Sequence, residues 1–341
     1  MDVLVTGGTG RIGANVVRQL TQRGDRVRCV VRPSSPRLSK LIPFVESSGL
    51  EIVEVDLTDR EGLSATVEGV DAVVHFGAKL GSTTHFEQLD INTAPTLTLL
   101  EAVRTRNPGL KRFVYGSSDT LFPHTGYMPE LITLDDIFRK PRSTYAVSKI
   151  AGGAFVDCYQ QMAGIPTVTL YIPYTFCGRE FLGERVQAIS PLIESHLADL
   201  EHRPPSPERD GAIAELREAF ADGKRLVIPI CKEGPPHKHH LGDVRDVARA
   251  TLSALDNETA IGGSFIVMSK PYHSDIATKH LAAVSGLDYA EILFPYSQFY
   301  EYDVSHTSEK LGFDPEYDGS QMLEDAWRQK HGEDIGVVDV G

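Results

Sequence analysis

TGGTGRIG, residues 6–13, decides how the rest of the chain is organised. The five residues before it form a short apolar run typical of a buried strand, and the residues after it carry apolar side chains at helical spacing. Gly7, Gly10 and Gly13 therefore lie at a strand-to-helix turn, where glycine permits a tight bend and close approach of the backbone to a pyrophosphate. The helix then presents unpaired N–H groups to the phosphates. The stretch predicts a dinucleotide-binding unit, with a purely structural glycine turn as the alternative.

The composition of the chain limits its class. It has 341 residues, 41% of them hydrophobic, and a formal net charge of −13. The length predicts two lobes or one enlarged domain, and the negative charge argues against nucleic acid or an anionic membrane surface as a partner. No stretch approaches the roughly 20 apolar residues of a membrane span, and the strand pattern at the first residue leaves no room for a signal peptide. Cys29, Cys158, Cys177 and Cys231 are irregularly spaced, which favours free thiols and a cytoplasmic setting.

The strand that follows the first helix bears on cofactor choice. Residues 26–32 read as this strand, and its end reads Val31-Arg32-Pro33-Ser34-Ser35. An NAD-binding unit normally carries Asp or Glu there to hold the ribose 2′-hydroxyl. A guanidinium and hydroxyl groups suit a 2′-phosphate instead, because arginine can form paired hydrogen bonds with phosphate oxygens. The segment favours NADP over NAD, with a solvated arginine as the alternative reading.

Three further apolar runs complete the alternating pattern. They lie at residues 50–57, 71–76 and 112–116 and are separated by stretches with helical periodicity. This alternation predicts an α/β fold, a Rossmann-type doubly wound parallel sheet. Asp56 and Leu57 end one strand, where the carboxylate could bind the adenine amine and the leucine could pack on the ring. His75 ends the next strand and is expected to be a packed, hydrogen-bonded histidine. A helix is expected from about residue 90 to 105, with Pro95 tolerated in its first turns.

Polar residues at the ligand end of the sheet indicate chemistry. Ser118 follows the strand at 112–116, and Tyr145 and Lys149 share one face of a predicted helix. A neighbouring ammonium lowers the pKa of a phenol, so Tyr145 could move a proton while Ser118 holds the substrate oxygen.

The ordered set of motifs resembles the extended short-chain dehydrogenases/reductases of the NAD-dependent epimerase/dehydratase group. The set comprises TGGTGRIG, Asp56-Leu57, HFGA from His75, Asn92, FVYGSS ending at Ser118, YAVSK from Tyr145, DVRDVA from Asp243 and DVSHTSEKLGFDP near the carboxyl end. The resemblance implies that Ser118 polarises the reacting oxygen, Tyr145 is the general acid/base, and Lys149 binds the nicotinamide ribose. It further implies cofactor contacts by Gly7, Gly10, Arg11, Ile12, Gly13, Arg32, Ser34, Asp56, Leu57, Phe76, Gly77, Ala78, Asn92, Tyr145, Lys149 and Pro173. The candidate substrate residues are Lys79, Ser118, Asp119, Thr120, Thr175 and His239.

Two departures from the family pattern concern the substrate. His239 stands where nucleotide-sugar members carry an arginine for the substrate diphosphate, and Ile172 replaces the arginine of another motif. Neutral side chains do not supply the permanent charge that a buried diphosphate requires. A free sugar, a sugar acid or another small polyol or carbonyl compound is therefore expected. Asp119 resembles the acid of dehydratase members, but Thr120 leaves the usual Asp-Glu pair incomplete, so a loop-anchoring role is favoured.

The resemblance implies a Rossmann domain over residues 1–178, with 237–268 returning to it, and a smaller α/β substrate lobe over 179–236 and 269–330. The polar, proline-rich run at residues 202–207, within the stretch 195–211, predicts an exposed loop or lid. His237, His239 and His240 fit no zinc-binding spacing, so no metal is expected. The resemblance also implies a homodimer, packed through the helix carrying Tyr145 and the helix near Asn92.

Three functions stay open at this point. The first is a dehydrogenase or reductase with net cofactor turnover on a sugar-like or other small substrate. The second is an epimerase or dehydratase that oxidises its substrate transiently and returns the hydride. The third is a non-catalytic regulator that senses NADP, against which the presence of Ser118, Tyr145 and Lys149 argues.

Overall fold

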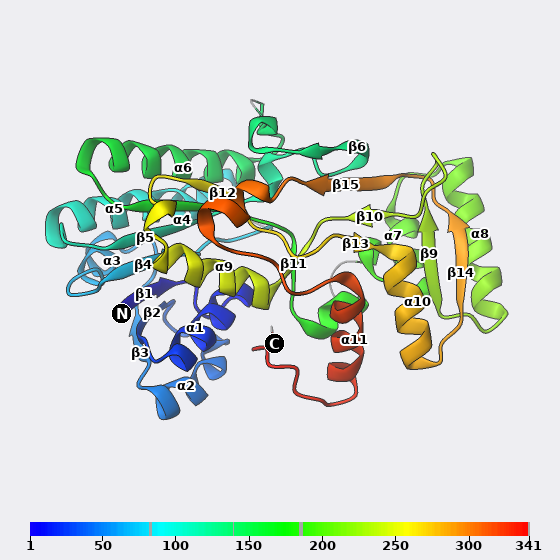
Figure 1. Cartoon of the computed structure of the whole chain (residues 1–341), viewed down its shortest axis with the longest axis horizontal. Helices are drawn as coiled ribbons and strands as arrows, with labels where there is room; N and C mark the ends of the chain where they lie inside the picture. The colour runs from blue at the N-terminus through cyan, green and yellow to red at the C-terminus, as the bar shows by residue number, and fades with distance from the viewer. Residues whose placement is uncertain (82–83, 139, 184–186, 340–341) are drawn as a thin grey trace.

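The computed structural model describes residues 1–81, 84–138, 140–183 and 187–339. Within these residues, seven strands form one parallel sheet in the order β12-β7-β5-β4-β1-β2-β3, with helices on both faces (Figure 1). The chain starts in the middle of the sheet and winds outward on both sides, which is the predicted Rossmann-type arrangement. The strands are β1 (Asp2–Thr6), β2 (Arg26–Val31), β3 (Glu51–Glu54), β4 (Ala72–His75), β5 (Arg112–Ser118), β7 (Thr167–Ile172) and β12 (Ser264–Ile266).

Alternate residues of the central strand enter two different cores. Val3 and Val5 pack in the core under α1 and α9, whereas Leu4 packs in the core under α3, α5 and α6, because successive side chains of a strand point to opposite faces. Burial on both faces explains why these strands are almost wholly apolar. The helices of this part are α1 (Arg11–Arg23), α2 (Ile42–Ser48), α3 (Arg60–Ala65), α4 (His85–Asn92), α5 (Ala94–Arg106), α6 (Thr144–Ala163) and α9 (Val244–Asp256).

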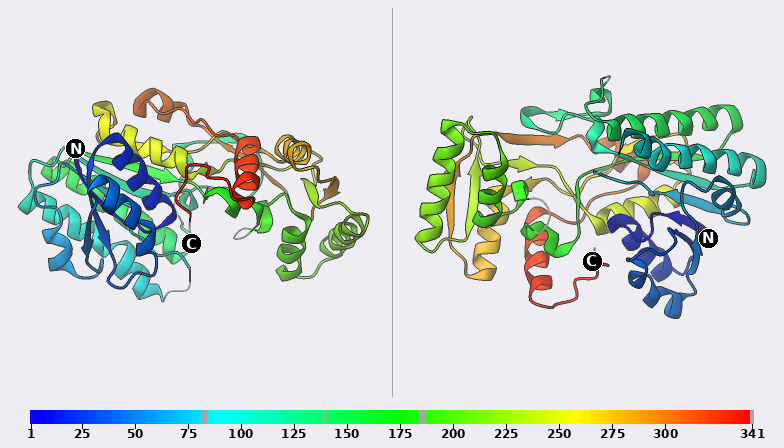
Figure 2. Two further views of the ribbon diagram at one scale, coloured as in Figure 1. Left: turned by 90° about the horizontal axis from the view of Figure 1, so that it is seen from below. Right: turned by 180° about the vertical axis from the view of Figure 1, so that it is seen from behind.

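A smaller α/β lobe lies at the other end of the molecule (Figures 1 and 2). Among the described residues, four strands form a mixed sheet in the order β13-β10-β15-β6, and two pairs of strands, β14-β9 and β11-β8, lie beside it. The strands are β6 (Gly126–Ile132), β8 (Thr175–Phe176), β9 (Leu226–Ile230), β10 (Lys238–His239), β11 (Gly242–Asp243), β13 (Tyr272–His273), β14 (Tyr289–Leu293) and β15 (Gln298–Tyr302). The helices are α7 (Ile193–His202), α8 (Pro207–Ala221), α10 (Ser274–Ser285) and α11 (Gly319–Lys330).

The boundaries of the two lobes stay a prediction. The small sheet draws β6 from the range 1–178 and β10 from the range 237–268, so both ranges also contribute to the substrate side. No helix in the described ranges is long and apolar enough to cross a membrane.

One prediction about local structure is wrong. The helix expected from about residue 90 to 105 is two helices that meet at Thr93, because Pro95 has no N–H for the helix ladder and its ring clashes with the preceding turn. The loop expected at residues 202–207 is confirmed, because residues 203–206 form a short connection between α7 and α8. Ser206 caps α8 by accepting a hydrogen bond from Arg209 N at 3.2 Å, and Pro207 lies in the first turn, where proline starts a helix.

Candidate active site

Ser118 and Tyr145 come together at the carboxyl edge of the large sheet. Ser118 is the last residue of β5, and Tyr145 lies in the first turn of α6, whose start is fixed by Ser143 accepting a hydrogen bond from Ala146 N at 3.1 Å. The Ser118 hydroxyl lies close enough to the Tyr145 phenol to lower its pKa. Ser118 Oγ also accepts hydrogen bonds from Thr120 N at 3.2 Å and from Thr120 Oγ1 at 3.1 Å. The substrate residues predicted after β5 therefore hold one another in place.

Lys149 lies one turn further along α6 and is almost fully buried. Its Nζ donates a hydrogen bond to Gly116 O at 2.8 Å and lies 5.9 Å from the centre of the Tyr145 ring. Burial lowers the pKa of Lys149 to about 8, because a buried ammonium loses its hydration. The ammonium is therefore held beside the acid/base candidate.

The pKa of Tyr145 is raised to about 12, not lowered as the sequence predicted. Burial is the largest cause and disfavours the phenolate; the Ser118 hydroxyl lowers the pKa, and the nearby Asp119 raises it again. In the protein alone, the desolvation of the phenol therefore outweighs the effects that stabilise the phenolate.

Asp119 joins the ends of two strands. Its Oδ1 lies 3.4 Å from Ser118 Oγ, and its Oδ2 accepts a hydrogen bond from Tyr174 N at 2.9 Å, just beyond β7. Burial raises the pKa of this carboxyl. Burial chiefly raises the pKa of Tyr300 and Tyr302 in β15, and the charge of Asp119 raises both further, so these late residues lie near Asp119. The sequence analysis missed both tyrosines, because no local signal links residues 300–302 with the end of β5.

The glycine turn fits a dinucleotide phosphate. Gly7 has a φ of +75°, and a Cβ there would lie 2.8 Å from Gly77 N at the end of β4, so only glycine allows the loop to pack this closely. The helix behind the turn begins at Arg11 after Gly10, which gives no side-chain cap to the first-turn N–H groups. Uncapped N–H groups at a helix start suit an anion.

The remaining candidate cofactor residues line the same edge of the sheet. Asp56 accepts hydrogen bonds from Thr58 N and Oγ1, which chiefly lower its pKa, and the charge of Arg32 lowers that pKa further. Arg32 therefore lies near Asp56 and is exposed, as is Ser34. Asn92 exchanges hydrogen bonds with the backbone of Lys79 at 2.7 and 3.1 Å, which holds the loop after β4 against α4.

His75, expected to be a packed histidine, and His239, a candidate substrate residue, are both buried among other side chains. His75 bonds with Thr6 Oγ1 at 2.7 Å and Thr96 Oγ1 at 3.1 Å, and burial lowers its pKa to about 3. His239 is 1% exposed, and its Nδ1 has no hydrogen-bond partner among the described residues. Burial lowers the pKa of His239 well below its usual value, so the imidazole is neutral. Its ring centre lies 5.8 Å from those of Tyr272 and Tyr300 in the small lobe.

An open pocket of about 700 Å³ adjoins Tyr145. It lies where the starts of α4 and α6 meet, and it is lined by Gly81, His85, Gln88, Pro141, Arg142, Ser143, Thr144, Tyr145 and Val147. The acid/base candidate is thus reachable from the surface.

Comparison with known proteins identifies similar dehydrogenases and dehydratases. The chain is 32% identical over 180 residues to a uronate dehydrogenase from Pseudomonas putida, covering 51% of this chain and 61% of that protein. It is 29% identical over 194 residues to a dTDP-glucose 4,6-dehydratase from Streptomyces niveus, covering 52% and 56%. The chain thus spans only about three fifths of the length of these relatives, and about a third of another.

A solved structure matches the whole chain. It is a short-chain dehydrogenase/reductase superfamily protein from Agrobacterium tumefaciens with bound NAD, with a TM-score of 0.76, 28% identity, and coverage of 97% of this chain and 98% of that one. The model of the NAD dependent epimerase/dehydratase family matches residues 3–267. The chain therefore belongs to the NAD dependent epimerase/dehydratase family, a family of enzymes.

Proposed function

We propose that this protein is an NAD(P)-dependent oxidoreductase that moves hydride between a nicotinamide and a hydroxyl or carbonyl carbon of a small, sugar-like substrate. The observation that carries the proposal is the convergence of Ser118, Tyr145 and Lys149 at the carboxyl edge of the sheet, beside a glycine turn that fits a dinucleotide.

A bound nicotinamide dinucleotide supplies the hydride acceptor or donor, and the chain's own residues move the proton. Ser118 holds the oxygen of the reacting carbon by a hydrogen bond. Tyr145 takes the proton of that oxygen when the alcohol is oxidised and returns it when the carbonyl is reduced. The ammonium of Lys149 lies beside the Tyr145 ring, and a positive charge near a phenol favours the phenolate.

Two neutral residues, His239 in β10 of the small lobe and Ile172 at the end of β7 in the large sheet, support the proposed substrate class. His239 is buried and neutral at the place of the expected diphosphate ligand, and Ile172 is apolar. A diphosphate brought against these residues would lose hydration without gaining an ionic partner. A free sugar carries no charge and a sugar acid carries only one carboxylate in place of a diphosphate, and the similarity to uronate dehydrogenase supports this substrate class.

NADP is the proposed cofactor, with NAD as the alternative. Arg32 and Ser34 are exposed at the end of β2, where a ribose 2′-phosphate would lie. The solved relative at 28% identity holds NAD, so the comparison of both cofactors is part of the test.

A second candidate function is transient oxidation within an epimerase or dehydratase. The buried carboxyl of Asp119, 3.4 Å from Ser118 Oγ and raised in pKa, favours it, because a protonated acid could assist water elimination. The hydrogen bond from Tyr174 N to Asp119 supports the anchoring role instead.

Absorbance of the reduced nicotinamide tests the proposal. Purified protein is mixed with NADP or NAD and a panel of uronic acids, free aldoses and polyols. Steady accumulation of reduced cofactor with one substrate, abolished in Tyr145→Phe, is the expected result. A Tyr145→Phe variant that keeps the full rate contradicts the role of Tyr145. If no substrate reduces the cofactor but chromatography shows that a nucleotide sugar is converted, the epimerase or dehydratase function replaces the first proposal.

A homodimer is proposed on the exposed apolar residues of two adjacent helices. Phe86 and Leu89 on α4 are 78% and 50% exposed, and Val147 on α6 is 48% exposed. Apolar side chains gathered on neighbouring helices mark an interaction surface. Sedimentation equilibrium is expected to show a dimer at micromolar concentration that Phe86→Glu dissociates, whereas a monomeric wild type contradicts the proposal.

A further inference from the structure

Arg11, the first residue of α1, directs its side chain toward Thr175 and Glu180. Its guanidinium forms a paired ion bridge with Glu180, at 2.7 Å from Nε and 3.0 Å from Nη2, and donates a third bond to Thr175 O at 2.9 Å. Arg11 is 17% exposed and Glu180 is 7% exposed. These contacts join the glycine turn to a segment that begins more than 160 residues later.

The segment that receives Arg11 is itself held firmly. Thr175 lies in β8, which pairs with β11, and Glu180 lies in the short 3₁₀ turn Gly178–Leu182. Glu180 also accepts a hydrogen bond from Cys177 N at 3.2 Å, and the same turn is tied to α11 because Arg179 N donates to Gln329 Oε1 at 2.7 Å. Arg11 is therefore attached to a fixed support.

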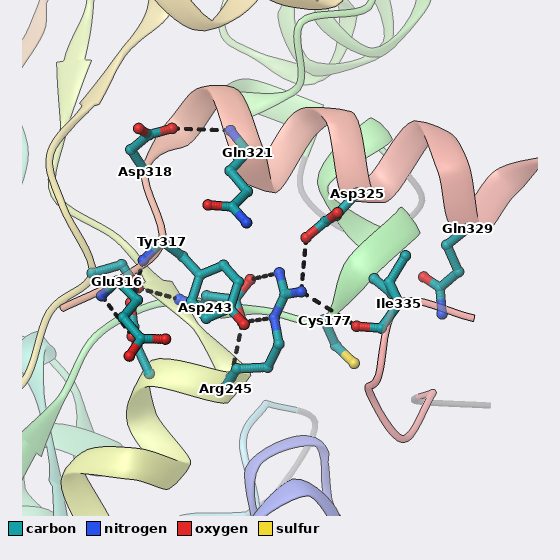
Figure 3. A network of polar contacts seen from close by, with 12 residues as sticks. Cys177, Asp243, Arg245, Glu316, Tyr317, Asp318, Gln321, Asp325, Gln329 and Ile335 are labelled. Atoms are coloured by element: carbon teal, nitrogen blue, oxygen red, sulfur yellow. Dashed lines mark hydrogen bonds and ion pairs between the residues drawn. The ribbon is translucent and has the colours of Figure 1, made fainter. Parts of the chain in front are cut away.

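A second arginine fixes this support to the carboxyl-terminal helix. Figure 3 shows Arg245 pointing between Asp243 of β11 and Asp325 of α11, with ion bridges of 2.8 and 2.7 Å. The same guanidinium donates to Ile335 O at 3.3 Å. Beyond it, the backbone of Val338 exchanges hydrogen bonds with Asn15, on the second turn of α1, at 2.8 and 3.2 Å. The start of α1 is thus held from both sides.

We propose that Arg11 and Glu180 are a positioning pair that holds the glycine turn in its phosphate-binding conformation, and that Arg11 binds the cofactor through its backbone and not its guanidinium. A turn rich in glycine has many accessible conformations, and an anion gains most from N–H groups that are ordered before it binds. Arg11 also neutralises the Glu180 carboxylate, which would otherwise repel a pyrophosphate.

This inference rests on the proposed use of a dinucleotide, and calorimetric titration tests the two separately. Wild-type protein is titrated with NADP and NAD without substrate; no binding of either would refute the proposed function. If wild type binds, Glu180→Gln is expected to weaken binding about tenfold, because the turn loses its preorganisation. Arg11→Gln is expected to weaken it more, because the Glu180 charge is then left uncompensated near the phosphates. The double variant is expected to weaken binding less than the product of the two single effects, since both remove one interaction.

The direction of the Glu180→Gln effect is decisive. If Arg11 were a phosphate ligand restrained by Glu180, releasing it would tighten binding, so tighter or unchanged binding overturns the inference. A lowered melting temperature with unchanged cofactor affinity also overturns the inference. The same holds if the fold-changes in Kd of the two single variants multiply in the double variant. Asp256→Asn is the matched control, because it breaks the Arg23–Asp256 bridge at the far end of the same helix and is expected to leave affinity unchanged.

Discussion

Lys149 Nζ lies 5.9 Å from the centre of the Tyr145 ring while donating a 2.8 Å hydrogen bond to the carbonyl oxygen of Gly116, two residues before Ser118. One buried ammonium therefore touches the strand that carries the serine and faces the ring of the tyrosine. Because Lys149 is 4% exposed, neither water nor a mobile counter-ion can replace its charge readily.

Removing this ammonium is expected to slow the reaction rather than unfold the protein. We expect Lys149→Met to lower kcat about 100-fold or more, the range in which assistance to general acid–base catalysis falls. Methionine fills the same space without the cost of a buried charge, so the melting temperature is expected to change little. Steady-state kinetics and a thermal melt of both proteins check this. A kcat within twofold of wild type would contradict the role of Lys149.

The raised pKa of Tyr145 predicts the pH dependence of both directions. Oxidation needs the phenolate, which is scarce at neutral pH when burial raises the pKa of Tyr145 to about 12. The oxidation rate is therefore expected to rise with pH through the neutral range, whereas reduction, which needs the protonated phenol, is expected to stay level there. Profiles of kcat/KM between pH 6 and about pH 9 in both directions check this. An oxidation rate that falls steadily above pH 7 would contradict Tyr145 as the base.

The sequence predicted the parts of the site that local patterns encode. The glycine spacing in residues 6–13 identifies a strand-to-helix turn, and the four-residue interval between Tyr145 and Lys149 places both on one helix face. The position of Ser118 at the end of a strand could also be predicted to lie in the site, because all parallel strands end at the same edge of the sheet. Ser118 and Tyr145 could therefore be brought together without a structure.

The sequence could not predict the partners of these residues. The resemblance implied a cofactor contact by Arg11, but no local pattern indicated that its guanidinium pairs with Glu180, 169 residues later. The pKa of Tyr145 depends on how completely the phenol is buried, which no spacing reveals. The break between α4 and α5 did have a local signal in Pro95, which the sequence analysis took as tolerable in one continuous helix.

Arg32 is expected to decide between the two cofactors. If its guanidinium binds a 2′-phosphate, Arg32→Glu should raise the Kd for NADP about tenfold or more, because it removes an ionic hydrogen bond and adds a repulsive charge. The Kd for NAD, which has a hydroxyl there, is expected to change little or to fall. Calorimetric titration of both cofactors measures this, with Arg37→Gln, a neighbouring exposed arginine, as the control. Equal effects on NADP and NAD would show that Arg32 is only a solvated surface residue.

Buried histidines in the small lobe are expected to make the fold sensitive to acid. Burial lowers the pKa of His237 to about 3 and that of His196 and His240 to about 4. Above about pH 6.5 these groups are neutral in the folded and unfolded chain alike, so they do not lower the free energy of unfolding. As the pH falls below that value the unfolded chain takes up protons that the folded chain does not, and each histidine removes about 1.4 kcal/mol of stability per pH unit.

These histidines therefore leave the free energy of unfolding unchanged above pH 6.5 and lower it progressively as the pH falls toward 4. Urea unfolding at pH 7.5 and pH 5 checks the expectation, with His237→Phe as the test variant. His237 stacks edge-on with Phe294 at 5.6 Å between ring centres, so an aromatic ring can take its place. This variant has one fewer proton to gain on unfolding, so its free energy of unfolding should fall less between the two pH values than that of wild type. His331→Phe, at an exposed histidine after α11, should keep the wild-type difference; an equal difference in His237→Phe would mean that other groups govern acid unfolding.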